Sequence, residues 1–323
     1  MGMATMEALS GIRHDSGEPR PIDPLHSNAT TQIQQSGSLE KTRPKRRGQD
    51  CRSCRPIALL IPVFCRQTKL NRTLASLTTE ADLLDVIVID DGSEPPVQIP
   101  PQSTLDIHLI RLSRNQGLAK ALNAGMEHAF ARGNPYIARL DSDDIAVAGR
   151  FRKQLAFMEA HPGVGICGSG YHEYNQSGQL QATILLPQDD RDIRRGMHLR
   201  TTLCHPTIML RASVARHIGY FDPAWKAEDI DYFTRALNIT RAANLPEPLI
   251  HYEVGSSDAL TGTPSRRRAL AREILQRKWQ HREPRCLLWW LGLLAASSYY
   301  LGINRWLAPF RNMSMRLVER RVL

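Results

Sequence analysis

Three aspartates within four residues, shortly after an apolar run, are the part of the sequence best suited to chemistry. The run is Tyr136-Ile137-Ala138, and the acidic cluster is Asp141-Ser142-Asp143-Asp144. Mg²⁺ and Mn²⁺ prefer oxygen ligands, and few carboxylates suffice where the phosphates of a substrate complete the coordination shell. The cluster therefore indicates a site for a divalent cation, although Asp-Ser-Asp also begins many solvated turns.

Short apolar runs alternate with helical patterns in the sequence around this cluster. The runs predict buried strands at residues 57–63, 85–89, 107–112 and 136–140. Leu70, Leu74 and Leu77 recur at helical spacing after the first run, with Thr68 available as the N-cap. This alternation predicts an α/β fold with a Rossmann-like, doubly wound and mostly parallel sheet.

Polar clusters follow all four predicted strands. Ligands of such sheets collect at the carboxyl ends of the strands, which meet at one edge. The clusters at that edge are Pro62 to Cys65, Asp90-Asp91, Asn115 to Gly117, and Asp141 to Asp144. Four successive strand ends of this kind predict a binding site, although single clusters such as Asp90-Asp91 and Asn115 to Gly117 could also serve as turns.

Composition and charge narrow the class of protein. The chain has 323 residues, 42% of them hydrophobic, and a mean hydropathy of −0.35, which fits a globular protein rather than a polytopic membrane protein. Six scattered cysteines form no disulfide framework and fit a reducing cytoplasm. The net charge of +10 resides in the segment from Ser265 to Leu323, which argues for one localised electrostatic contact and against a nucleic-acid-binding surface.

The motifs, in their order and spacing, resemble glycosyltransferase family 2, whose members carry the GT-A fold. The resemblance runs from about Pro56 to about His251. Each piece is weak alone, and the series together is specific. The pieces are Ile61-Pro62-Val63-Phe64, the segment from Val88 to Ser93, Asn115 to Asn123, Leu140 to Asp144, Arg150 to Gln154, His205-Pro206-Thr207, and Ala227 to Asp231.

The resemblance implies an inverting transferase that uses a nucleotide-diphosphate sugar and a cofactor cation, Mn²⁺ or Mg²⁺. Asp141 and Asp143 match the Asp-x-Asp motif that contacts the ribose and the metal, and Asp144 is an additional candidate ligand. Asp229 matches the general base. By position, Pro62 and Phe64 would border the nucleobase, and Asp91 would accept a hydrogen bond from its ring. The full set of expected donor-binding residues is Pro62, Phe64, Asp91, Asn115, Gly117, Asp141 and Asp143.

Physical chemistry supports the role of Asp229 independently. An acceptor hydroxyl needs a base within hydrogen-bond reach. Asp229 begins the apolar-periodic segment Ile230, Phe233, Leu237, so we expect it at a helix N-terminus, whose positive end would keep it ionised. The competing interpretation is an acidic first turn that only stabilises the helix. A departure from the family pattern is Glu253, which stands where an arginine is expected and leaves a positive contact to the diphosphate unassigned.

The C-terminal segment is basic and apolar. Eighteen uncharged residues from Cys286 to Ile303 include paired tryptophans and tyrosines, and arginines flank them. Eighteen residues lie at the lower limit for spanning a bilayer, and Trp and Tyr prefer its interface. We therefore expect peripheral attachment to the anionic inner face of the plasma membrane, with a core or dimer helix, or a true span, as alternatives.

The expected organisation has three parts. Residues 1–55 are a disordered basic extension, 56–255 a GT-A glycosyltransferase domain, and 256–323 a helical tail. The expected function is sugar transfer from a nucleotide sugar, in particular a UDP-sugar, to a saccharide or lipid-linked saccharide acceptor of bacterial surface polysaccharide. The alternatives are a nucleotidyltransferase, which would need a glycine-rich basic loop after the first strand, and a non-catalytic binder of sugar nucleotides or polyanions.

Overall fold

The fold is known from a computed structural model that describes residues 55–101, 103–254, 264–280, 287–301 and 320–322. The strands are β1 Ile57–Val63, β2 Leu84–Asp90, β3 Asp106–Arg111, β4 Tyr136–Arg139, β5 Ile145–Ala146, β6 Val164–Tyr174, β7 Leu180–Leu185, β8 Met209–Arg211, β9 Arg241–Glu253 and β10 Arg320–Val322. The helices are α1 Gln67–Ala75, α2 Leu118–Arg132, α3 Arg150–Ala160, α4 Asp190–Met197, α5 Ala212–Ile218, α6 Glu228–Leu237, α7 Pro264–Gln280 and α8 Leu287–Leu301, with 3₁₀ turns η1 Thr78–Glu80 and η2 His205–Thr207.

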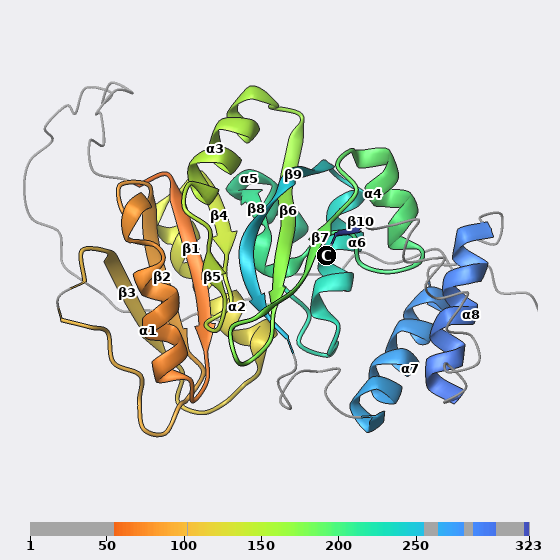
Figure 1. The fold of residues 1–323 in the computed structure, drawn as a ribbon, viewed down its shortest axis with the longest axis horizontal. Helices are drawn as coiled ribbons and strands as arrows, with labels where there is room; N and C mark the ends of the chain where they lie inside the picture. The colour runs from red at the N-terminus through yellow and green to blue at the C-terminus, as the bar shows by residue number, and fades with distance from the viewer. Residues whose placement is uncertain (1–54, 102, 255–263, 281–286, 302–319, 323) are drawn as a thin grey trace, which may run out of the picture. The chain divides into compact units, whose positions relative to one another are not determined.

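The strands form one mixed sheet, in the order β10-β7-β6-β8-β4-β1-β2-β3 (Figure 1). β4, β1, β2 and β3 run parallel to one another, and β8 joins β4 antiparallel. β9 lies off this path, where it pairs parallel with β6 and antiparallel with β5. The predicted α/β fold is confirmed, and the antiparallel strands after β4 are additions that the sequence patterns did not reveal.

Helices cover both faces of the sheet, because both faces of its parallel strands are apolar. Every residue of β1 and of β2 is buried. Ala58 and Leu60 of β1 pack into a core with apolar residues of α2, α5 and α6. Leu59 and Ile61 point to the other face, where α1 and α3 supply Leu70, Leu74, Phe151 and Met158. The two cores hold the parallel strands, and hence their carboxyl ends, in fixed positions.

The predicted strands and helices of the first half are confirmed, apart from one detail at a helix end. α1 begins at Gln67 without a side-chain cap, so Thr68 lies inside the helix and the predicted N-cap is wrong. The predicted disorder of residues 1–55 falls almost wholly outside the described residues, and the tail boundary at 255/256 stays a prediction. No helix in the described part of the chain has both the length and the apolar character needed to cross a bilayer.

Candidate active site

Hydrogen bonds join the loops that follow β1, β2 and β3. The carboxylate of Asp91, after β2, accepts the backbone N–H groups of Gln116 at 2.7 Å and Gly117 at 2.9 Å in the loop after β3. The backbone N–H of Cys65, after β1, donates to Ser93 Oγ at 2.8 Å. The polar clusters at these three strand ends therefore lie together, as the sequence predicted.

Two glycines in these loops have backbone conformations that favour glycine, and one of them also permits a close backbone approach. Gly92 has φ +74°, and a Cβ there would lie 2.3 Å from the carbonyl carbon of Arg114. Gly117 has φ +89° where it caps α2. Both backbone conformations lie in the region that L side chains rarely adopt. The shape of the edge thus depends on glycine at these positions.

The expected donor-binding residues differ in how much surface they offer. Phe64 is 45% exposed just beyond β1, and Asn115 is exposed in the loop after β3. Pro62 is buried inside β1, and Asp91 is only 5% exposed. Phe64 and Asn115 are accessible to a nucleotide, whereas Asp91 already orders the loop that carries Gly117.

The acidic cluster after β4 is held by basic side chains. Asp141 accepts a hydrogen bond from the Arg139 guanidinium, and Asp143 accepts one from Arg66 in the loop after β1. The Lys69 ammonium group of α1 lies 3.9 Å from the Asp143 carboxylate. The end of β4 therefore lies beside the end of β1, so all four polar clusters lie at one edge of the sheet.

Asp144 is the least compensated of the three aspartates. It is 1% exposed, and its Oδ2 has no hydrogen-bond partner among the described residues. Burial and the neighbouring Asp141 and Asp143 raise its pKa well above the ordinary value. Three carboxylates, one with an unpartnered buried oxygen, have the donor chemistry of Mg²⁺ or Mn²⁺ and could hold the implied cation, although in the described part of the chain their ligand atoms do not all lie within 4.8 Å of one another.

Asp229 lies in the first turn of α6, as predicted. Its pKa is nevertheless raised, mainly because it is buried, while Arg139 lowers the pKa and Asp141 raises it further. Desolvation thus outweighs the backbone N–H groups, which by themselves lower this pKa, and the expectation that Asp229 is ionised stays a prediction. Arg139 and Asp141 both influence the pKa of Asp229, so Asp229 lies within electrostatic range of the acidic cluster.

The neighbouring Glu228 is buried beside a histidine. Glu228 is 6% exposed, and its Oε1 lies 3.8 Å from His205 Nδ1. Burial, and then Asp229, raises the pKa of Glu228 to about 7. Burial lowers the pKa of His205 well below its usual value, so this histidine is neutral. Asp231, in contrast, pairs with Arg235 at 2.8 Å and fits the competing interpretation of an acidic, stabilising first turn.

Sequence reasoning missed several residues of this site. Arg139 has the strongest local signal, because it ends β4 only two residues before Asp141, to which its guanidinium donates. Tyr252, near the end of β9, is half-buried; desolvation and then Asp141, with a smaller effect of Asp144, raise its pKa. Glu253 forms an ion pair with Lys69 at 2.6 Å, so the glutamate in place of the expected arginine has its own partner. The contacts of β9 depend on tertiary packing, which left no signal in the sequence.

A second group of metal-capable side chains lies at the opposite edge of the sheet. Within the described residues, Asp85, Asp106 and His108 bring three ligand atoms close together. Asp85 and Asp106 begin β2 and β3, so they stand at the amino ends of the parallel strands, away from Asp141 and Asp143. Arginines already pair with both carboxylates, so this group does not serve the candidate active site.

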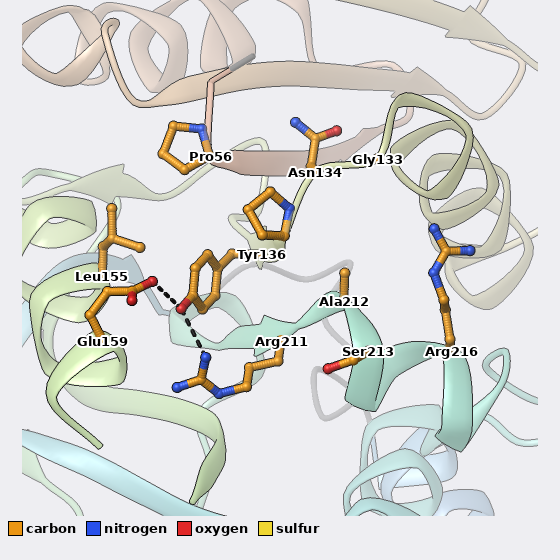
Figure 2. A pocket seen from close by; sticks show the side chains of 11 residues that line it. Pro56, Gly133, Asn134, Tyr136, Leu155, Glu159, Arg211, Ala212, Ser213 and Arg216 are labelled. Carbon is orange, nitrogen blue, oxygen red and sulfur yellow. Dashed lines mark hydrogen bonds between the residues drawn. The ribbon is translucent and has the colours of Figure 1, made fainter. Parts of the chain in front are cut away.

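A pocket of about 750 Å³ also opens at that amino edge. It lies where Pro56 precedes β1 and Tyr136 begins β4. Figure 2 shows the Tyr136 hydroxyl between Glu159 and Arg211, whose Nη1 donates to it at 2.9 Å. The pocket is therefore separate from the polar carboxyl edge and does not mark the donor site.

Comparisons with known proteins agree with this geometry. The family model described as "Glycosyl transferase family 2" matches residues 58–219. The amylovoran biosynthesis glycosyltransferase AmsE of Erwinia amylovora is 30% identical over 209 residues, which are 62% of this chain and 76% of AmsE.

Solved structures share the architecture. S. aureus TarS 1-349, in complex with UDP-GlcNAc, gives a TM-score of 0.53 at 18% identity over 76% of this chain and 73% of TarS. The mannosyltransferase PcManGT from Pyrobaculum calidifontis, in complex with GDP-Man and Mn²⁺, gives 0.53 at 16% identity over 81% of this chain and 74% of its own. These likenesses concern the fold, which resembles GT-A structures. Because the family model covers half of the sequence, the chain belongs to glycosyl transferase family 2.

Proposed function

We propose that the protein is an inverting, metal-dependent glycosyltransferase that moves a sugar from a nucleotide-diphosphate sugar to a saccharide acceptor. One observation carries this proposal. Asp229 and the cation-binding candidate Asp141 interact electrostatically with each other and with the buried Arg139, although 88 residues separate the two aspartates. This electrostatic coupling supports the proposal, because a base and a leaving-group site must be near one another for one sugar to be attacked and released in a single step.

Asp229 acts as the general base in this proposal. Its raised pKa supports the role, because the best catalytic base has a pKa near the working pH. Asp229 takes the proton of the acceptor hydroxyl, whose oxygen attacks the anomeric carbon from the face opposite the diphosphate. Inversion at that carbon follows from this direction of attack.

Asp141, Asp143 and Asp144 would hold the cation. When bound, Mn²⁺ or Mg²⁺ supplies Lewis-acid stabilisation of the charge on the departing diphosphate. Arg66 and Arg139 hold Asp143 and Asp141 through hydrogen bonds and would keep these carboxylates oriented when no cation is present. The Mn²⁺ in the PcManGT complex supports the choice of cation.

The donor and acceptor follow from weaker observations. The exposed ring of Phe64 suits stacking on a nucleobase, and the UDP-GlcNAc in the TarS complex supports a UDP-sugar. The name of AmsE supports a place in polysaccharide biosynthesis, with a saccharide or a lipid-linked saccharide as acceptor. A lipid-linked saccharide acceptor would bring the enzyme to the cytoplasmic face of the plasma membrane.

Replacing Asp229 by asparagine tests the catalytic role. D229N should lose turnover by about 10²-fold or more and retain donor affinity, measured as metal-dependent thermal stabilisation by a UDP-sugar. Asp192→Asn is the matched control, because Asp192 also lies in a first helical turn but is 58% exposed. Full turnover in D229N would mean that Asp229 is not the base, and binding of the donor without turnover in the wild type would leave a sugar-nucleotide binder; either result would end the proposal.

A further inference from the structure

Helix α8 has two apolar faces of different character. Trp289, at 3% exposed, and Ala296, at 9%, lie on its inward face with Gly292. Five large apolar residues lie on the opposite side at the spacing of one helix face. They are Leu287 at 72% exposed, Trp290 at 46%, Leu291 at 37%, Leu294 at 61% and Leu301 at 64%. We call these five residues the outer face of α8.

Helix α7 packs against α8 and has a different surface. Arg268 and Arg272, one turn apart, are exposed together with Ser265 and Gln276. The sequence from Ser265 to Leu323 holds 13 basic and 3 acidic residues. The two helices together therefore present both an uncharged apolar face and a basic one, which neither helix presents alone.

We propose that the outer face of α8 docks on a lipid bilayer that contains anionic headgroups. The five side chains enter the boundary between headgroups and acyl chains, which is the region that indole side chains such as that of Trp290 prefer. The exposed arginines of α7, Arg268 and Arg272, attract the anionic lipids. The inference rests on the proposed function in one respect, since a membrane surface is where a lipid-linked acceptor would be met.

A second copy of the chain fits this face less well than a bilayer does. The outer face offers on the order of 500 Å² of apolar surface. A stable protein interface buries roughly 800 Å² on each partner, so the helix face alone falls short. Two copies would also bring two basic tails together, whereas an anionic membrane attracts the same charge. Area and charge both favour lipid.

Vesicle binding of the full chain tests the inference. We expect the wild-type protein to sediment with phosphatidylglycerol-containing vesicles and much less with phosphatidylcholine alone. Leu294→Gln should weaken this binding by about tenfold, because one buried leucine is lost from the contact. Leu180→Gln is the matched control, since Leu180 is 50% exposed on β7 and should change binding less than about twofold.

A second pair of measurements separates charge from folding. Arg268→Gln and Arg272→Gln should each weaken binding to anionic vesicles by about fivefold, with no change for neutral vesicles. Donor-induced thermal stabilisation should be the same in all variants, which shows that they fold and that the donor site is intact. If the donor stabilises the wild-type protein but the protein does not bind anionic vesicles, only this inference is overturned. If the donor does not bind the wild-type protein at all, the proposed function is overturned.

Two results would overturn the membrane assignment directly. One is equal vesicle binding by L294Q and the wild type. The other is a wild-type dimer in sedimentation velocity that L294Q converts to monomer, because the outer face would then be a contact between copies of the chain.

Discussion

Replacing Glu228 by glutamine should change how stability depends on pH. Burial raises the pKa of Glu228 from 4.5 to about 7, so the folded protein holds this proton more tightly than the unfolded chain does. The stabilisation from the protonated carboxyl is fully present below pH 4.5 and is lost as the pH rises through about 7. At about 1.36 kcal/mol for each pKa unit, the shift corresponds to about 3 kcal/mol.

Glutamine imitates the protonated carboxyl at every pH, so the difference between the two proteins isolates this ionisation. The free energy of unfolding of the wild type, relative to E228Q, should fall by about 3 kcal/mol between about pH 4.5 and about pH 8. Urea unfolding followed by circular dichroism in metal-free buffer measures both proteins. Glu127→Gln, at an exposed position of α2, is the control and should give a difference that stays flat with pH.

A constant difference between wild type and E228Q across this range would refute the reasoning. It would mean that Glu228 is solvated, or is compensated by Arg139, well enough to titrate alike in the folded and unfolded chains. A difference that grows in the opposite direction would show that the carboxylate, rather than the carboxylic acid, is the stabilised form.

Two further predictions concern the edge of the sheet and its charge. Gly92→Ala should destabilise the protein by about 2 kcal/mol or more, because φ is +74° and the Cβ would meet backbone of Arg114 at 2.3 Å. Gly163→Ala, where a Cβ meets nothing within 4 Å, should leave the thermal midpoint nearly unchanged. Arg139→Met should move the acid limb of the pH profile of kcat/KM to higher pH, since Arg139 lowers the pKa of Asp229. If the acid limb does not shift, Arg139 does not influence the pKa of the catalytic base.

The carboxyl edge of the sheet was predictable because short-range patterns determine it. Each parallel strand is a continuous apolar run, and the first polar residues after it must stand at the same edge. The hydrogen bonds from Asp91 to the loop of Gly117, and from Arg66 to Asp143, are the physical outcome of that rule. The side-chain partners themselves were not predictable, since Arg66 reaches across 77 residues to Asp143.

The second half of the site depends on packing that no local pattern encodes. β9 lies parallel to β6 and brings Tyr252 and Glu253 to the acidic cluster. The raised pKa of Asp229 was not predicted, for a related reason. A helix N-terminus is visible in sequence, whereas the burial that outweighs it arises only when α6 packs on the sheet.

The charged side chains of the site make binding of the donor depend on binding of the cation. Six carboxylates and four basic side chains interact around the end of β4. They are Asp141, Asp143, Asp144, Glu228, Asp229 and Glu253, with Arg66, Lys69, Arg139 and Arg150. These carboxylates would repel a diphosphate that approached alone, and a divalent cation bound between them and the diphosphate would offset that repulsion. Donor and cation should therefore bind cooperatively, each raising the affinity for the other by the same factor.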